Sequence, residues 1–138
     1  MGSEDSRIAV VTCMDARLDA AGFLDAWPAP VHIVRNAGGR VTADALRSLA
    51  VSCAMGTQRV LVVHHTGCAM AAHADEQIRD LLPPGADPEV DFLTIADPLE
   101  ALREDVQAVK DSTLLQPGIE VEGLIYDLDA RTARAIQI

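Results

Sequence analysis

The segment Val10-Val11-Thr12-Cys13-Met14-Asp15-Ala16-Arg17 is the most informative part of this chain. An apolar run from Ile8 to Val11 ends abruptly in a thiol, a carboxylate and a guanidinium that are spaced two residues apart. A short run of this kind, bounded by polar residues, predicts a buried strand. In an open parallel sheet, ligands bind at the carboxyl ends of the strands. We therefore expect the polar residues after Val11 to lie at a functional edge of a sheet.

A second segment is built in the same way. Arg59 to His65 carries another run of Val and Leu and leads directly into His64-His65-Thr66-Gly67-Cys68. If the two strands are neighbours, then Cys13, His65 and Cys68 meet at one edge of the sheet. Two thiolates and one imidazole are a ligand set of catalytic zinc sites, in which the fourth position stays open. Inert core thiols are the alternative for each cysteine alone, but the combined spacing favours a metal.

Asp15 can act in two ways at such a site. It lies close enough to Cys13 in the sequence to reach the same metal, which would close the site. Alternatively, Arg17 can hold the carboxylate in a bidentate pair, which is strong and directional. In that arrangement Asp15 is free to orient a nucleophile. We expect Asp15 and Arg17 to be the catalytic residues, and the sequence leaves both arrangements open.

Composition limits the class of protein. The 138 residues are 49% hydrophobic but only 3% aromatic, which predicts one domain over residues 1–138 with an aliphatic core. The net charge of −10 argues against nucleic acid or an anionic membrane as a partner. The cysteine number is odd, and no segment resembles a signal peptide or a membrane span. We therefore expect a reduced, cytoplasmic protein.

The order of predicted elements is typical of an α/β fold. Short apolar runs predict strands at 8–11, 31–34, 59–65 and 119–128, and helical patterns are found at 18–27, 43–55, 70–82 and 98–109. Residues 92–95 can be a short extended piece or a loop, and 132–138 can form a hairpin with the preceding strand or a tail. We expect a mostly parallel four-stranded sheet with helices on both faces and an antiparallel C-terminal edge strand, which the pattern places at 119–128.

Three motifs together resemble those of the β-class carbonic anhydrases: Cys13-Met14-Asp15-Ala16-Arg17, Arg35-Asn36-Ala37-Gly38 and His65-Thr66-Gly67-Cys68. They are more similar still to the short bacterial branch that also includes carbonyl sulfide hydrolases. The resemblance extends from about Ile8 to Leu128. There are also departures, because Gly67 stands where that branch usually has Asp, Ala69 stands in place of Gly, and the N-terminal helical arm is almost absent.

The resemblance implies a function. It implies Zn²⁺ held by Cys13, His65 and Cys68, an Asp15–Arg17 dyad, and a homodimer with the active site near the subunit interface. The implied reaction is the reversible hydration of carbon dioxide to bicarbonate. Hydrolysis of carbonyl sulfide or carbon disulfide at the same zinc site is one alternative, and a non-catalytic, zinc-stabilised dimer is another. A thiol phosphatase fits poorly, because only three residues separate Cys13 from Arg17 and one of them is an acid.

Other polar residues receive simpler interpretations. The turn at 35–38 either joins a strand to a helix or shares in the site, and the resemblance favours the second. We assign Cys53 and His64 to core packing and His32 to a structural role. We assign Arg40 and Arg47 to the solvated surface. His73 is a weaker candidate for a proton shuttle.

Overall fold

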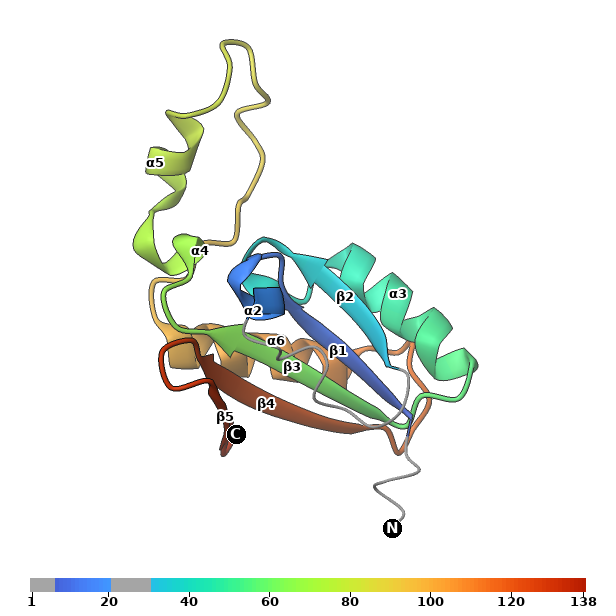
Figure 1. Cartoon of the computed structure of the whole chain (residues 1–138). Coiled ribbons are helices and arrows are strands. Elements are labelled where there is room, and N and C mark those ends of the chain that lie inside the picture. The colour runs from blue at the N-terminus through green and yellow to red at the C-terminus, as the bar shows by residue number, and fades with distance from the viewer. Residues whose placement is uncertain (1–6, 21–30) are drawn as a thin grey trace.

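The computed structural model describes residues 7–20 and 31–138, and its centre is one mixed sheet (Figure 1). Within these residues the sheet has five strands in the order β2-β1-β3-β4-β5. Their bounds are β1 Ile8–Cys13, β2 His32–Asn36, β3 Arg59–His65, β4 Glu120–Asp127 and β5 Thr132–Ile136. Strands β1 to β4 are parallel, and β5 is antiparallel to β4. The predicted sheet, mostly parallel with an antiparallel C-terminal edge strand, is confirmed.

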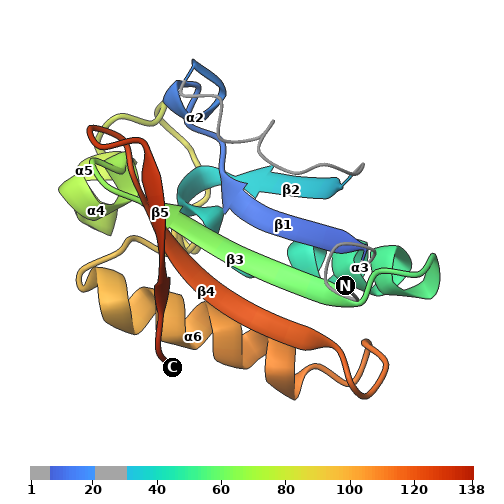
Figure 2. The same ribbon diagram turned by 60° about the horizontal axis from the view of Figure 1, so that its bottom comes forward.

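Helices lie on both faces of the sheet, as predicted, but they cover the faces unequally. Their bounds are α2 Arg17–Ala20, the 3-10 turn η2 Ala37–Gly39, α3 Ala43–Ala54, α4 Ala69–Ala72, α5 Asp75–Arg79 and α6 Pro98–Asp111. The two long helices, α3 and α6, lie on the same face (Figure 2). The core on that face contains Ala9, Val11, Leu49, Val60, Val62, Leu102, Val106 and Val109. On the opposite face, Leu18 of α2 packs with Ile8, Val10, Leu61 and Val63.

The placement of the antiparallel strand at 119–128 is wrong. That segment contains β4, which pairs in parallel with β3. The chain reaches β4 through α6, and a helical crossover returns it in the parallel direction. The direction reverses only after Asp127, whose Oδ1 accepts hydrogen bonds from the backbone of Asp129 and Ala130. The antiparallel strand is therefore β5, which forms the hairpin that the sequence left open.

The predicted helix at 70–82 is interrupted. In a continuous helix the carbonyl of Met70 would accept a hydrogen bond from the backbone N–H of Ala74. Instead, the N–H of Ile95 donates to Met70 at 2.7 Å, and Ala74 donates to Oε1 of Gln77 at 2.8 Å. The link at 73–74 is extended as a result, and α5 with the following loop projects away from the sheet (Figure 1). Residues 92–95 belong to this loop and form no strand.

The two long helices begin where their capping residues predict. Thr42 Oγ1 accepts from the N–H of Ala45 at the start of α3, and Asp97 Oδ1 accepts from Leu99 and Glu100 at the start of α6. Most of the predicted helix at 18–27 lies outside the described residues. No helix within residues 7–20 and 31–138 is both long and apolar enough to cross a membrane.

Candidate metal centre

Cys13, His65 and Cys68 meet at the carboxyl end of the sheet. Strands β1 and β3 are neighbours, with Thr12 opposite Val63, so Cys13 and His65 emerge at the same edge. Cys68 follows β3 by three residues, in the turn before α4. One ligand atom from each of the three residues lies within 4.8 Å of the others, and all three residues are buried. The structure thus brings together the three residues that the sequence singled out as ligands.

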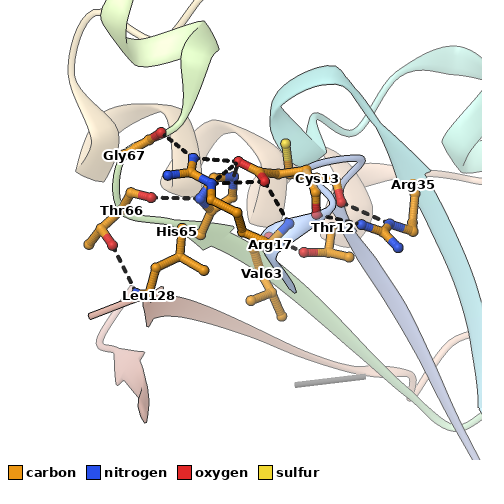
Figure 3. A network of polar contacts seen from close by, with 10 residues as sticks. Thr12, Cys13, Arg17, Arg35, Val63, His65, Thr66, Gly67 and Leu128 are labelled. Atoms are coloured by element: carbon orange, nitrogen blue, oxygen red, sulfur yellow. Dashed lines mark hydrogen bonds and ion pairs between the residues drawn. The ribbon is translucent and has the colours of Figure 1, made fainter. Parts of the chain in front are cut away.

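The imidazole of His65 is arranged as a metal ligand would be. Its Nδ1 lies 2.7 Å from the carbonyl of Thr66, and a carbonyl only accepts, so Nδ1 carries the hydrogen (Figure 3). The lone pair is then on Nε2. This atom is buried, and none of the described residues offers it a hydrogen bond. Because a buried polar atom without a partner costs about 1–3 kcal/mol, a metal ion bound at Nε2 would remove a real penalty.

The two thiols shift each other's pKa in opposite directions. The Cys68 thiol donates a hydrogen bond to Cys13, and this bond lowers the pKa of Cys13 well below its ordinary value. The pKa of Cys68 is raised, because losing its proton would break that bond and place two buried thiolates side by side. The pair therefore favours one ionised sulfur over two. Thiolates and imidazole are ligands that suit zinc and related soft metals.

Arg17 holds the Asp15 carboxylate in a bidentate pair. Nε of Arg17 donates to Oδ1 at 3.0 Å, and its NH2 group donates to Oδ2 at 2.5 Å. These bonds lower the pKa of Asp15 from 3.8 to about 2. Oδ2 also lies 3.7 Å from Nε2 of His65, so the carboxylate lies beside the candidate ligand atoms. Of the two arrangements that the sequence left open, the structure has Asp15 paired with Arg17.

Gly67 contributes to this pair through its backbone. Its carbonyl accepts a hydrogen bond from the NH2 group of Arg17 at 2.8 Å (Figure 3). Its φ of +67° lies in the left-handed region that favours glycine. Among the described residues other than its two chain neighbours, a Cβ at this position would have only Arg17 within 4 Å, at 3.6 Å from its NH1 group. The glycine therefore leaves open space beside the guanidinium.

The turn at 35–38 lies against the segment that carries Cys13 and Asp15. Its share in the site stays a prediction. The backbone N–H of Met14 donates to the carbonyl of Asn36 at 2.8 Å. The Asn36 side chain closes the turn by bonding both to the N–H and to the carbonyl of Arg40. Gly39 follows with a φ of +67°, and a Cβ there would lie 3.0 Å from the backbone N of Cys13. This close approach is possible because residue 39 has no side chain.

The prediction of a solvated Arg40 is wrong. Arg40 is 6% exposed, and its Nε donates to Oδ2 of Asp105 in α6 at 2.8 Å. His64 also contacts this oxygen, at 2.9 Å from Nε2, on the side of β3 opposite to His65. The sequence offered no sign of the Arg40 pair, because its partner lies on a distant helix. Arg47, in contrast, is exposed as predicted and pairs only with Asp44 among the described residues.

The other histidines and the third cysteine lie away from the ligand cluster. Nδ1 of His32 lies 2.6 Å from Oγ of Ser52, which agrees with a structural role. Cys53 is buried in α3, and burial raises the pKa of its thiol. His73 is exposed in the link between α4 and α5, and its role as a proton shuttle stays a prediction.

Comparison with known proteins places this fold and site in one family. The carbonic anhydrase family model matches residues 8–110. β-Carbonic anhydrase 1 of Mycobacterium tuberculosis is 32% identical over 124 residues, a match that covers 88% of this chain and 76% of that protein. A crystal structure of carbonic anhydrase from Streptococcus mutans is similar with a TM-score of 0.82 and 41% identity, covering 96% of this chain and 82% of that one.

Carbon disulfide hydrolases are also among the relatives. The enzyme of that name from Acidithiobacillus thiooxidans is 31% identical over 161 residues, covering 97% of this chain and 74% of its own. The chain belongs to the β-class carbonic anhydrase family. Within that family it has curated relatives of both kinds, carbonic anhydrases and carbon disulfide hydrolases.

Proposed function

We propose that this protein catalyses the reversible hydration of carbon dioxide to bicarbonate, with one Zn²⁺ per chain held by Cys13, His65 and Cys68. The observation that carries the proposal is the Asp15–Arg17 pair beside these ligands. Asp15 is the one carboxylate close to the cluster in the described residues, and both of its oxygens are engaged by Arg17. A catalytic zinc site has three protein ligands and an open fourth position, whereas a structural zinc site has four protein ligands. Here Arg17 holds the fourth candidate ligand, Asp15, away from the other three.

The residues around the ligands have distinct roles in this proposal. Bound to the three ligands, Zn²⁺ supplies the Lewis acidity that makes water a nucleophile near neutral pH. Asp15 would accept a hydrogen bond from that water and orient it toward the carbon of carbon dioxide. Arg17 keeps the carboxylate ionised and in place. The Thr66 carbonyl holds the His65 ring in the tautomer and orientation that ligation needs.

A stopped-flow assay of carbon dioxide hydration tests the proposal. The zinc-loaded protein should hydrate carbon dioxide, and Arg17→Ala should retain about one zinc per chain while losing at least about tenfold in kcat/KM. The reason is that in Arg17→Ala the Asp15 carboxylate is free to move to the metal and to close the fourth position. Arg47→Ala is the matched control, because it removes an exposed arginine far from the site. Zinc-loaded protein that is inactive toward carbon dioxide would overturn the proposal.

Hydrolysis of carbonyl sulfide or carbon disulfide is the second candidate. The similarity to carbon disulfide hydrolases favours it, and the same orienting carboxylate and metal ligands would serve a linear substrate that contains sulfur. Sulfide release from each compound, measured beside carbon dioxide hydration, separates the two activities. Zinc-loaded protein that turns over none of these substrates would instead support a non-catalytic, zinc-stabilised dimer.

We also propose that the protein is a homodimer, as its family membership implies. A hollow of about 460 Å³ between β2 and α3 is lined in part by the exposed apolar side chains of Ile33, Val51 and Met55. Burial of such side chains in a partner subunit is favourable. Sedimentation velocity at micromolar concentration should show a dimer, and a stable monomer would refute the proposal.

A further inference from the structure

Arg35 connects the end of β2 to the turn that carries the candidate site. Its Nε donates to the carbonyl of Cys13 at 2.9 Å (Figure 3). Its NH2 group donates to the carbonyl of Asp15 at 2.8 Å. One rigid guanidinium therefore bonds to the carbonyls on both sides of Met14. Both acceptors are backbone carbonyl oxygens and not the candidate metal-ligand atoms.

The sheet register explains why Arg35 reaches this turn. In the β1–β2 pairing, Thr12 lies opposite Arg35 and Cys13 lies opposite Asn36. The first residues beyond β1 then pass directly beside the end of β2, where the Asn36 carbonyl accepts from the N–H of Met14. This bond and the two bonds from Arg35 tie the end of β2 to the Cys13–Asp15 turn.

The turn decides where two functional groups point. The Cys13 thiol lies with His65 and Cys68 in the ligand cluster. The Asp15 carboxylate is paired with Arg17 instead, although its Oδ2 is only 3.7 Å from Nε2 of His65. If this turn shifted and the carboxylate left Arg17, Asp15 would be the nearest carboxylate to the three candidate ligands among the described residues. Hydrogen bonds from a charged donor are about twice as strong as neutral ones, so Arg35 resists that shift.

We propose that Arg35 is a positioning residue, which fixes the Cys13–Asp15 turn so that Asp15 remains on Arg17 and the fourth metal position stays accessible. Lysine cannot replace it, because an ammonium group lacks the planar fork that reaches both carbonyls at once. The proposal rests on the metal site of the proposed function, but it does not depend on which substrate the site turns over.

Anion binding to the cobalt-substituted protein tests this role without measuring turnover. Co²⁺ at a site with thiolate ligands absorbs visible light, and thiocyanate changes the spectrum if it can enter the fourth position. We expect thiocyanate to bind about tenfold more weakly to Arg35→Met and Arg35→Lys than to the parent protein, because the loss of a charged hydrogen bond has about this effect. Arg47→Met should bind thiocyanate as the parent protein does.

A double variant separates positioning from a general loss of structure. If Asp15 blocks the fourth metal position in Arg35→Met, then the double variant Arg35→Met/Asp15→Asn should recover thiocyanate affinity. If Arg35→Met instead damages the fold, the second substitution would not restore thiocyanate affinity. Parent-like thiocyanate affinity in Arg35→Met, or no recovery in the double variant, would overturn the proposal. Parent protein that binds Co²⁺ and thiocyanate but hydrates no carbon dioxide would refute the proposed function and leave the Arg35 test intact.

Discussion

Nε of Arg40 donates to Oδ2 of Asp105 at 2.8 Å, although 65 residues separate the two in the chain. Both side chains are buried, and Asp105 also accepts from the backbone N–H of Val41 at 3.1 Å. The pair joins the turn after β2 to helix α6. Gly39 of that turn lies against the backbone of Cys13. By fixing the turn, the ion pair therefore also stabilises the backbone of a candidate metal ligand.

Loss of one partner of this pair should be costly. In Arg40→Met the Asp105 carboxylate stays buried without its main charge partner, so the free energy of unfolding should fall by about 3–5 kcal/mol. Urea denaturation followed by circular dichroism measures this change. Arg47→Met removes an exposed arginine and should change the free energy by less than about 0.5 kcal/mol. Equal effects of the two substitutions would show that the Arg40 pair contributes little.

The Asp15 carboxyl should titrate far below its ordinary range. Hydrogen bonds from Arg17 favour the ionised form, which lowers the pKa from 3.8 to about 2. The pair is therefore present above the ordinary pKa and is lost as the pH falls through about 2. Carboxyl-carbon NMR of the parent protein should show this midpoint, and Arg17→Ala should raise it toward 3.8. An unchanged midpoint in Arg17→Ala would mean that Arg17 does not stabilise the carboxylate.

Gly39→Ala should disturb both the fold and the metal site. The new Cβ would lie 3.0 Å from the backbone N of Cys13, and the φ of +67° disfavours any residue with a side chain. We expect a loss of about 1–3 kcal/mol in stability, together with weaker zinc binding. Gly118→Ala is the matched control, since its φ is +89° but no atom of the described chain beyond its two neighbours lies within 4 Å of the new Cβ. If the two variants bind zinc equally well, the contact with Cys13 does not matter for the metal.

Zinc binding should become tighter as the pH rises. The pKa of Cys68 is raised by its hydrogen bond to Cys13, so ligation by both sulfurs must release a proton from Cys68. The affinity should therefore increase about tenfold per pH unit for each proton released. Competition with a chelator at several pH values measures this slope. Cys53→Ala should leave the slope unchanged, because Cys53 is buried in α3 outside the cluster. A zinc affinity that does not change with pH would contradict the release of this proton.

Local patterns were sufficient to predict much of the fold and to select the candidate ligands. Buried strands such as β1 and β3 are recognisable as apolar runs, and capping residues such as Thr42 act within one turn of a helix. The order of strands and helices indicates a parallel sheet, in which strand ends gather at one edge. Cys13, His65 and Cys68 could therefore be grouped before their distances were known.

The tertiary structure decided the features that depend on distant partners. The carbonyl of Met70 bonds to Ile95 rather than to the next helical turn, which breaks a helix that the local pattern favours. Asp15 pairs with Arg17 instead of closing the site, and Arg40 is buried because Asp105 lies opposite it. A sequence pattern shows which groups are polar or apolar, but hydrogen bonds and ion pairs also require a partner, and only the packed chain determines which partner is near.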